Sequence, residues 1–405
     1  MRSTYFFLLL VCIFSAGIYS CEPASKPVTP ESLGFSSDSL QAAEVAMQAY
    51  IDSGDFAGIS TLVMKQGHII QRANFGYADM EDQLSMTDST IFRIFSMTKP
   101  ITAVALMTLY DEGKFQLDDK VADYIPEFGE SKVHVEEDGQ HKFVDQEPAM
   151  TIRHLLTHTS GISYGWTNSY VDSVYRSTGA SGWDGVLADK MKILADLPLN
   201  FQPGSSYQYG LSIDVAGYLV EVLSGMPLDE YFQTKIFDPL GMDDSGFYVP
   251  EEDHGRFSAV YRFDDDGKLV AAGGRFGDAF KTPVTMFSGG GGLVSTVDDY
   301  LTFCRMLVNA GELNGARILT PETAKMIMTN QMPEGLEYEE GKGYGLAGSV
   351  QLADGEYSWG GAASTSFWII PEQELIVMAY AQLMPADFGY ANHFKKLVDN
   401  AVIQE

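Results

Sequence analysis

The sequence predicts an α+β fold, in which an antiparallel sheet flanked by helices carries an additional helical subdomain. Three observations lead to this prediction. Short apolar, strand-like runs lie near the amino end, at 59–64 and 68–75, and several more lie near the carboxyl end, between 344 and 381. The region between them, roughly 115–285, mixes helix-like patterns with loops that contain Gly and Pro. Strands at both ends with helices between them favour one sheet built by both ends of the chain, with a helical insertion.

The expected elements follow from local patterns. Ser37 or Asp38 is expected to cap the first helix, because both residue types are good helix caps. The tripeptide 65–67 (Lys-Gln-Gly) separates the first two strands and so predicts a hairpin. The remaining elements are a helix over 96–113, strands over 344–352, 357–360, 365–370 and 374–381, and an amphipathic helix over roughly 390–403.

Composition excludes some classes of function. The 405 residues include 26 Lys and Arg against 55 Asp and Glu, a formal net charge of −29, and 45% are apolar, enough for a large core. Nucleic-acid binding is not expected, because phosphate recognition needs a basic stripe and the sequence has none. Electrostatic adhesion to anionic lipid is disfavoured for the same reason. We interpret the acidity as a contribution to solubility.

The amino terminus has the pattern of a secretory signal peptide over residues 1–20, with a positive start, an apolar run and small residues before Cys21. Cys21 resembles the lipidated cysteine of the bacterial lipoprotein box; an ordinary signal peptide with a chance cysteine is the alternative. The three prolines of 21–35 indicate a tether, so the folded domain is expected over 36–405. We therefore expect an exported protein, held at a bacterial membrane by its lipid anchor alone and facing the periplasm or the cell exterior.

Cysteine and histidine usage predicts neither an internal disulfide nor a metal site. Cys304 is the one cysteine in the body of the chain, and its helix-like surroundings indicate a core residue. The seven His residues form no His-Glu-x-x-His or His-x-His pattern. No metal and no cofactor are expected.

The strongest chemical motif is Ser96-Met-Thr-Lys99. If a helix begins at Ser96, residues three apart share a face, so the Lys99 ammonium can reach the Ser96 hydroxyl. Pro100 is tolerated near a helix start, which places Ser96 at the positive end of the helix dipole, where a developing oxyanion is stabilised. A partly desolvated lysine there can act as a base. The spacing alone is weak evidence, because a helix cap followed by a solvated lysine gives the same pattern.

A second stretch, 203–217, makes the interpretation specific. A Pro-Gly turn is followed, five residues after Gly204, by Tyr209-Gly-Leu. This arrangement resembles the serine β-lactamase and penicillin-binding-protein superfamily, and within it the family VIII carboxylesterases. Three further stretches agree in order and content: 151–162, the glycine run in 288–298, and the Trp-Gly-Gly of 359–361 at the position of the third motif. The resemblance covers roughly residues 35–400.

The resemblance implies a β-lactamase/transpeptidase-like fold, an active site in the cleft between sheet and helical subdomain, and an acyl-enzyme mechanism. Ser96 would attack a carbonyl, assisted by Lys99 and Tyr209, one of which is the base. The backbone N–H groups of Ser96 and Ala362 would form the oxyanion hole. The substrate-binding positions implied in the same way are Leu211, Trp359, Gly360 and Gly361.

Two departures from the β-lactamase motifs favour an esterase. Leu211 stands in place of the Asn of Tyr-x-Asn, and Trp359 in place of the Lys of Lys-Thr-Gly. An apolar wall suits neutral acyl esters better than anionic β-lactams, so a small-molecule ester or amide is the expected substrate. A β-lactamase or D-amino-acid peptidase with the same machinery is one alternative. A non-catalytic, lipid-anchored binding or sensory protein is another, and the oligomeric state is left open.

Other nearby residues are given structural roles. His154 and His158 lie in the shared segment 151–162 and are interpreted as structural. Asp214 and Glu221 are expected to be solvated or to act as caps on the helix after Tyr209. Candidates for an acyl pocket, with core packing as the default, are Tyr164, Trp166, Phe276 and Trp368.

Overall fold

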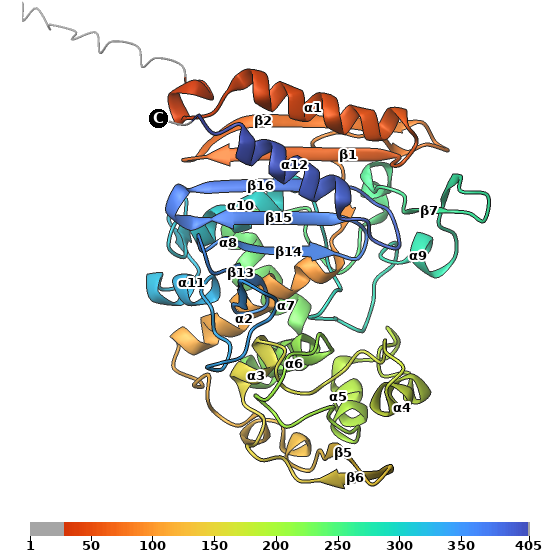
Figure 1. The fold of residues 1–405 in the computed structure, drawn as a ribbon, viewed down its shortest axis with the longest axis vertical. Coiled ribbons are helices and arrows are strands. Elements are labelled where there is room, and N and C mark those ends of the chain that lie inside the picture. The colour runs from red at the N-terminus through yellow and green to blue at the C-terminus, as the bar shows by residue number, and fades with distance from the viewer. Residues whose placement is uncertain (1–27, 404–405) are drawn as a thin grey trace, which may run out of the picture.

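The structure is a computed structural model that describes residues 28–403, apart from the side chains of Arg275 and Phe276. The predicted signal peptide and Cys21 lie outside this range. Within it, eight strands form one antiparallel sheet in the order β12-β13-β14-β15-β16-β1-β2-β3 (Figure 1), and the α+β prediction is confirmed. The strands are β1 (Gly58–Lys65), β2 (His68–Asp79), β3 (Leu84–Ser85), β12 (Lys342–Tyr344), β13 (Ser349–Gln351), β14 (Tyr357–Gly361), β15 (Thr365–Ile370) and β16 (Leu375–Tyr380).

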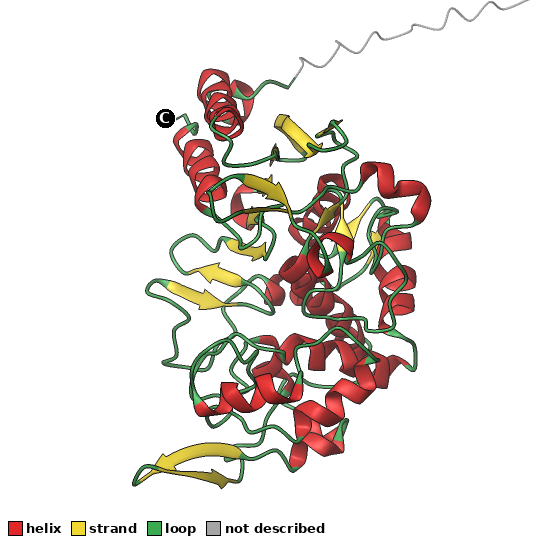
Figure 2. Ribbon diagram, turned by 90° about the vertical axis from the view of Figure 1, so that its right-hand side faces the viewer, coloured by secondary structure: helices red, strands yellow, loops and turns green. Residues whose placement is uncertain are grey.

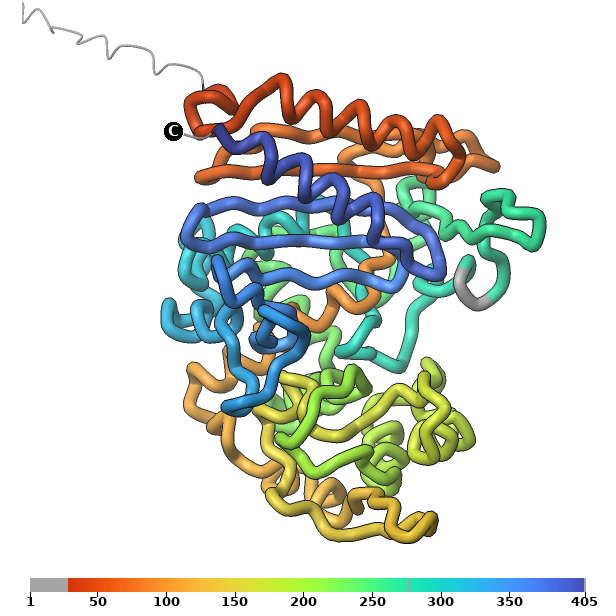
Figure 3. Tube along the Cα trace, in the orientation of Figure 1, coloured from red at the N-terminus to blue at the C-terminus, as the bar shows by residue number. Residues whose placement is uncertain are grey.

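The middle of this sheet joins the two ends of the chain. β1 pairs with β16 in a register that runs from Ser60 opposite Tyr380 to Lys65 opposite Leu375. On its other side β16 pairs with β15. Figure 3 shows the junction, where orange strands from the amino-terminal part lie beside blue strands from the carboxyl-terminal part. Both central strands consist almost wholly of buried residues, because helices cover both faces of the sheet.

One face of the sheet is covered by the first and last helices, α1 (Ser37–Asp52) and α12 (Gly389–Asn400). Met47 of α1 and Phe394 of α12 share an apolar core with Val63 of β1. The amphipathic pattern of both helices is thus explained by one surface, since their apolar sides meet the sheet and each other.

The opposite face packs on a larger core that contains α2 (Thr98–Asp111) and α10 (Val297–Val308). Cys304 lies buried in α10, as predicted for a core residue. Successive residues of β16 alternate between the two cores, as the two-residue period of a strand requires: Leu375, Val377 and Ala379 face α1 and α12, whereas Ile376, Met378 and Tyr380 face the larger core.

The helical subdomain lies below the sheet in Figure 1, and Figure 2 shows the same region from the side, with a two-stranded hairpin at its lower end.

Among the described residues, no helix has the length and apolar character needed to cross a membrane. The remaining helices are α3 (Ile152–Leu156), α4 (Tyr170–Thr178), α5 (Leu187–Ala195), α6 (Ser212–Ser224), α7 (Leu228–Phe232), α8 (Asp238–Leu240), α9 (Arg275–Asp278) and α11 (Pro321–Ile327). The remaining strands are β4 (Phe92–Arg93), β5 (Val133–Glu137), β6 (Gln140–Val144), β7 (Tyr261–Phe263), β8 (Leu269–Ala271), β9 (Val294–Ser295), β10 (Glu312–Leu313) and β11 (Ala316–Arg317).

The folded region begins slightly before the expected boundary at residue 36. Ser36, rather than Ser37 or Asp38, caps α1, because its side chain accepts a backbone N–H of the first turn. Phe35, the last residue of the expected tether, is buried and forms a β-bridge with Val402. The two ends of the described chain therefore meet.

The strand expected over 344–352 is divided in two. β12 ends at Tyr344 and β13 begins at Ser349. Between them Ala347 has a φ of +64°, and its N–H donates to the C=O of Leu156 in the helical subdomain. A contact with a distant part of the chain thus interrupts an apolar pattern that is locally continuous.

Candidate active site

Ser96 lies in a short turn directly before α2. A 3-10 helix, Phe95–Met97, precedes α2, so the helix begins two residues after Ser96 rather than at Ser96 as expected. Phe95 has a φ of +40°, which is a strained conformation for a bulky residue. Its ring packs against Trp183 and Phe280, and this packing holds the strained turn in place. The positive end of the α2 dipole lies beside Ser96.

Lys99 is fully buried, and oxygen atoms from three residues hold its ammonium. Nζ donates to Ser96 Oγ at 3.2 Å, to the Tyr164 hydroxyl at 3.1 Å and to the Gly290 C=O at 2.6 Å. Nζ also lies 4.5 Å from the centre of the Tyr209 ring, within the range of a cation–π interaction. The two ends of the Ser-x-x-Lys motif are thus in direct contact.

Tyr209 reaches Ser96 from the loop before α6. Its hydroxyl donates to Ser96 Oγ at 2.7 Å. The ring of His158 lies 4.8 Å from the Tyr209 ring, and its Nδ1 accepts the N–H of Gly210 at 3.3 Å. Burial, assisted by the nearby Lys99 charge, lowers the pKa of His158 well below its ordinary value. The imidazole is therefore neutral and can accept a hydrogen bond at Nδ1.

A glycine-rich turn bridges α2 and α6 behind Lys99. Gly290 accepts the Lys99 ammonium at its C=O and donates its N–H to Asp214 Oδ1 at 3.3 Å. The Ser288 hydroxyl donates to the same carboxylate oxygen at 2.6 Å. Asp214 is only 2% exposed, so the expectation that it is solvated was wrong, and its carboxylate anchors the turn. Glu221 does act as a cap, because it accepts the first backbone N–H of α7.

The third motif lies at the end of β14. Gly361 packs so closely on the turn of the candidate nucleophile that a Cβ there would lie 2.3 Å from the Ile94 oxygen. Ala362, the next residue, lines the cavity at that nucleophile. Trp359 contacts the Tyr209 ring, with ring centres 5.5 Å apart. The motif therefore supports both the nucleophile turn and the tyrosine.

A cavity of about 360 Å³ opens at Ser96. Leu211, at the start of α6, is buried in its wall. Trp359, Gly360 and Gly361 are not among the residues that line this cavity, although Trp359 contacts the Tyr209 ring. The other side chains in the wall include Tyr164, Trp166, Trp183, Ala279 and Met384.

The predicted aromatic lining is correct in part. Tyr164 and Trp166 line the cavity and stack on each other, with ring centres 4.3 Å apart. Trp368 does not belong to it, because it is buried between the sheet and the helices α1 and α12. The side chain of Phe276 lies outside the described part of the structure.

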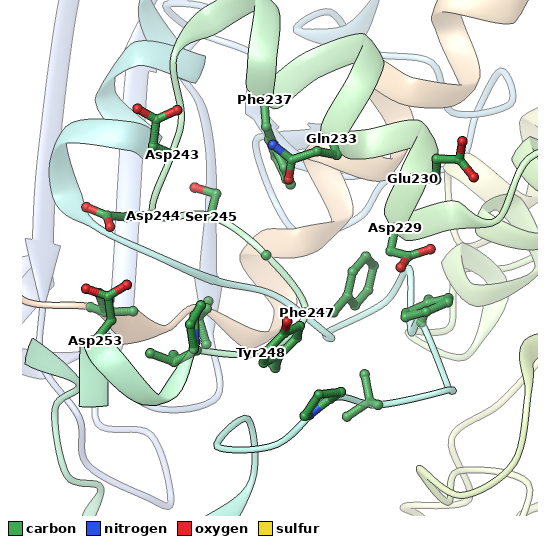
Figure 4. A pocket seen from close by; sticks show the side chains of 18 of the residues that line it. Asp229, Glu230, Gln233, Phe237, Asp243, Asp244, Ser245, Phe247, Tyr248 and Asp253 are labelled. Atoms are coloured by element: carbon green, nitrogen blue, oxygen red, sulfur yellow. The ribbon is translucent and has the colours of Figure 1, made fainter. Parts of the chain in front are cut away.

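A larger cavity, of about 480 Å³, lies away from Ser96 and is shown in Figure 4. Phe237 and Phe247 contribute to its apolar lining. Its carboxylates belong to two groups, from α7 and from the segment after α8. Ser96 lines the smaller cavity and not this one, so we assign the chemistry to the smaller one. The carboxylates are those of Asp229, Glu230, Asp243, Asp244 and Asp253.

Sequence reasoning missed the roles of two residues in the site, Tyr164 and Asp214. Burial, and then the neighbouring Tyr209, raises the pKa of Tyr164 well above its ordinary value, so its phenol stays neutral as a partner of Lys99. One signal was available, since Tyr164 closely follows the shared segment 151–162 and Asp214 lies in the first turn of the helix after Tyr209. The partners of both residues come from distant segments of the chain, so the sequence alone does not identify them.

The comparisons with known proteins agree with this geometry. Residues 43–400 match the Beta-lactamase family model. Esterase EstB of Burkholderia gladioli is 34% identical over 382 residues, which cover 84% of this chain and 91% of EstB. Lovastatin esterase of Penicillium rubens is 28% identical over 382 residues, covering 85% and 93% of the two chains. The solved structure of EstCE1, described as a hydrolase with promiscuous acyltransferase activity, has a TM-score of 0.73 and 26% identity, and the match covers 91% of this chain and 99% of that one.

These matches span nearly all of the described chain and include every motif that meets at Ser96. The lysine and the tyrosine of those motifs are both hydrogen-bonded to Ser96, which lines the cavity. We conclude that the protein belongs to the beta-lactamase family of serine hydrolases and, within it, resembles the esterases.

Proposed function

We propose that this protein hydrolyses carboxylic esters with neutral acyl groups through an acyl-enzyme on Ser96. The observation that carries the proposal is the position of Ser96 Oγ, 2.7 Å from the Tyr209 hydroxyl and 3.2 Å from Lys99 Nζ. A serine hydroxyl becomes a strong nucleophile when an adjacent base takes its proton. Both neighbours are within the distance that this transfer requires.

In the acylation step, Ser96 Oγ attacks the ester carbonyl while its proton passes to the base, which is either Tyr209 as a phenolate or Lys99 as a neutral amine. If Tyr209 is the base, the Lys99 ammonium beside its ring would stabilise the negative charge on the tyrosine oxygen. The carbonyl oxygen becomes an oxyanion, which the N–H groups of Ser96 and Ala362 would bind. The proton then moves to the leaving oxygen, the C–O bond breaks, and the alcohol departs.

The deacylation step uses the same groups with water as the nucleophile. Water gives its proton to the base and attacks the acyl carbon attached to Ser96 Oγ. The bond between that carbon and Oγ breaks, Ser96 recovers a proton, and the carboxylic acid leaves. No group beyond the side chains and backbone already described is needed for either step.

The walls of the site support an ester rather than an anionic β-lactam as substrate. The buried Leu211 offers no amide to a substrate side chain, and Trp359 stands at the position of the lysine of the third motif. The charged residues in the cavity wall are Lys190 and Asp214. Apolar walls with a few well-placed polar groups are typical of sites for uncharged ligands. Two of the relatives are named esterases, which agrees with this choice.

The proposal is tested by comparing hydrolysis of p-nitrophenyl butyrate, a chromogenic cephalosporin and a D-Ala-D-Ala peptide. The ester should be the fastest substrate, and Ser96→Ala should abolish its turnover. Lys99→Ala and Tyr209→Phe should each lower kcat by on the order of 10²–10⁴ if they transfer protons. Faster cleavage of the cephalosporin or the peptide would refute the ester assignment, and activity retained in Ser96→Ala would refute the acyl-enzyme.

A further inference from the structure

A second cavity lies directly beside the one at Ser96. It has a volume of about 300 Å³, and both cavities include Trp183 and Ala279 in their walls. Phe247, Val284 and Met286 contribute to its apolar lining. Asp184, Asp278 and Thr282 line its exposed side. The apolar part of such a space, next to a reaction site, is suited to the distal part of an acyl chain.

Three aromatic rings stand between the two cavities. Trp183 meets Phe280 edge to face, with ring centres 5.4 Å apart. Phe95, the residue before the nucleophile, contacts both rings at 6.1 and 5.6 Å. Trp183 lines both cavities, whereas Phe280 lines the second and Phe95 the first. Of these three rings, the indole of Trp183 is therefore the one that lines both spaces, together with the smaller Ala279.

Of the two rings, that of Phe280 is held more firmly by its surroundings than that of Trp183. Phe280 is 4% exposed, and its C=O accepts the N–H of Val249 at 2.7 Å. The buried Arg93 guanidinium donates to the C=O groups of Gly277 at 2.8 Å and Ala279 at 3.4 Å, just before it. Trp183, by contrast, is half-buried on the loop between α4 and α5. Trp183 can therefore be replaced with less disturbance than Phe280.

The direction of the acyl chain follows from the place of Tyr209. The leaving oxygen must lie within hydrogen-bond reach of the group that protonates it, so the alcohol lies on the tyrosine side. The Tyr209 ring contacts Trp166 and Trp359 there. The Trp183 ring instead contacts Phe95, the residue before the nucleophile, and Phe280. An acyl group on Ser96 therefore extends toward Trp183.

We infer that Trp183 limits the length of the acyl chain, so that the substrates are short-chain carboxylic esters and the indole separates the second cavity from the acyl site. This inference rests on the proposed ester hydrolysis. It assigns a specificity-determining role to a residue outside the three sequence motifs. Replacing the indole by a small side chain should join the two spaces and open the second one to the end of a longer chain.

The test compares kcat/KM for p-nitrophenyl butyrate and p-nitrophenyl octanoate in wild type and Trp183→Ala. Wild type should favour butyrate. Burial of one methylene is worth about 0.8 kcal/mol, or about 4-fold in rate. Filling part of the second cavity should therefore raise the octanoate-to-butyrate ratio by on the order of 10-fold or more. The matched control is Trp166→Ala, which removes an indole that lines the cavity at Ser96 but not the second cavity, so it cannot join the two spaces and should leave that ratio unchanged.

A second variant shows where the longer chain goes. Thr282 is exposed and lines the second cavity, so Thr282→Phe should refill it without disturbing the core. In the Trp183→Ala background this change should cancel the gain with octanoate. If Trp183→Ala does not fold, Trp183→Leu keeps apolar packing and should give a smaller gain of the same sign.

The outcomes separate this inference from the proposed function. An unchanged ratio in folded Trp183→Ala or Trp183→Leu would overturn the chain-length role while leaving ester hydrolysis intact. A gain equal to that of Trp166→Ala, or one that persists with Thr282→Phe, would also overturn it. Absence of ester turnover in wild type would instead refute the proposed function.

Discussion

The ring of His158 lies 4.8 Å from the ring of Tyr209, and its Nδ1 accepts the N–H of Gly210, the next residue in the chain. One neutral imidazole thus positions both the candidate proton-transfer residue and the backbone that follows it. His158 has a φ of +54°, a conformation that asparagine tolerates better than most residues. These features define a pair of informative substitutions.

His158→Phe keeps an aromatic ring but removes the acceptor, so the buried Gly210 N–H loses its partner. We expect kcat for p-nitrophenyl butyrate to fall by about 10-fold or more, since an unsatisfied buried donor costs about 1–3 kcal/mol. His158→Asn supplies a carbonyl acceptor and fits the left-handed backbone, so it should recover most of the activity. The measurement is steady-state kinetics with the melting temperature as a check on folding. Equal kcat values in the two variants would argue against the positioning role.

Asp214 should affect kcat indirectly, because it holds the turn of Gly290, which accepts the Lys99 ammonium. Asp214→Ala frees the glycine turn that accepts the Lys99 ammonium, so we expect a loss of kcat of about 10-fold with little change in KM, on the order of a charged hydrogen bond. Asp214→Asn retains an acceptor for Ser288 and Gly290 and should be much less impaired. The measurement is kcat and KM of both variants and of wild type on one ester. A change in KM alone would instead indicate direct contact with substrate.

Gly361 cannot be enlarged without moving the nucleophile turn. A Cβ at this position would lie 2.3 Å from the Ile94 oxygen and 2.4 Å from Thr365 Oγ1. Gly361→Ala should therefore lower the free energy of unfolding by about 1–3 kcal/mol, as overpacked sites do, and reduce turnover. Gly255→Ala is the control, because nothing lies within 4 Å of its Cβ position. Similar melting temperatures for the two variants would contradict the close contact.

Acid should destabilise the protein partly through His154. Burial lowers the pKa of His154 from 6.5 to about 4. Between these pH values the unfolded chain binds a proton that the folded chain does not, so the free energy of unfolding falls as the pH falls from 6.5 toward 4. His154 forms a capping box with Thr151, and glutamine fits that position without titrating.

His154→Gln should therefore flatten the pH dependence of stability by about 2 kcal/mol, somewhat less than a fully buried group would give. Urea unfolding at pH 7.5 and pH 4.5 measures the difference. At pH 7.5 the variant and wild type should be nearly equally stable. An unaltered slope would show that His154 binds its proton as readily in the folded chain as in the unfolded one.

The predicted lipid anchor concerns residues before the described range. If Cys21 carries the lipid, wild type should sediment with membranes, and Cys21→Ala should appear in the soluble fraction with its ester activity kept. Mass spectrometry of the mature amino terminus identifies the modification directly. A soluble wild type cleaved before Cys21 would support the simple signal peptide instead.

The sequence predicted correctly those parts of the fold and of the site that are determined by residues close together in the chain. The strand over 365–370 has the predicted bounds, because a continuous apolar run ends at Pro371. Ser96 and Lys99 were placed together correctly because three residues of helical backbone suffice to bring them into contact. In each case the cause lies within a few residues of the effect.

The features that were missed depend on contacts between distant segments. Asp214 looks like a solvated helix residue until the glycine turn packs against it. Trp183 and Phe280 lie almost a hundred residues apart in loops without a strong pattern, yet their rings meet beside the nucleophile turn. The break at Ala347 also depends on the helical subdomain, through Leu156. Such contacts have no local signature in one sequence.

The pairing of β1 with β16 determines when the molecule can become active. Ser60 and Tyr380 lie near opposite ends of the chain, so the central ladder of the sheet cannot form until the last strand has been synthesised. Contacts of such high sequence separation make folding slow, and one edge of β1 stays unpaired until then. A translation product that stops before residue 375 would therefore contain Ser96, Lys99 and Tyr209 but no scaffold to bring them together.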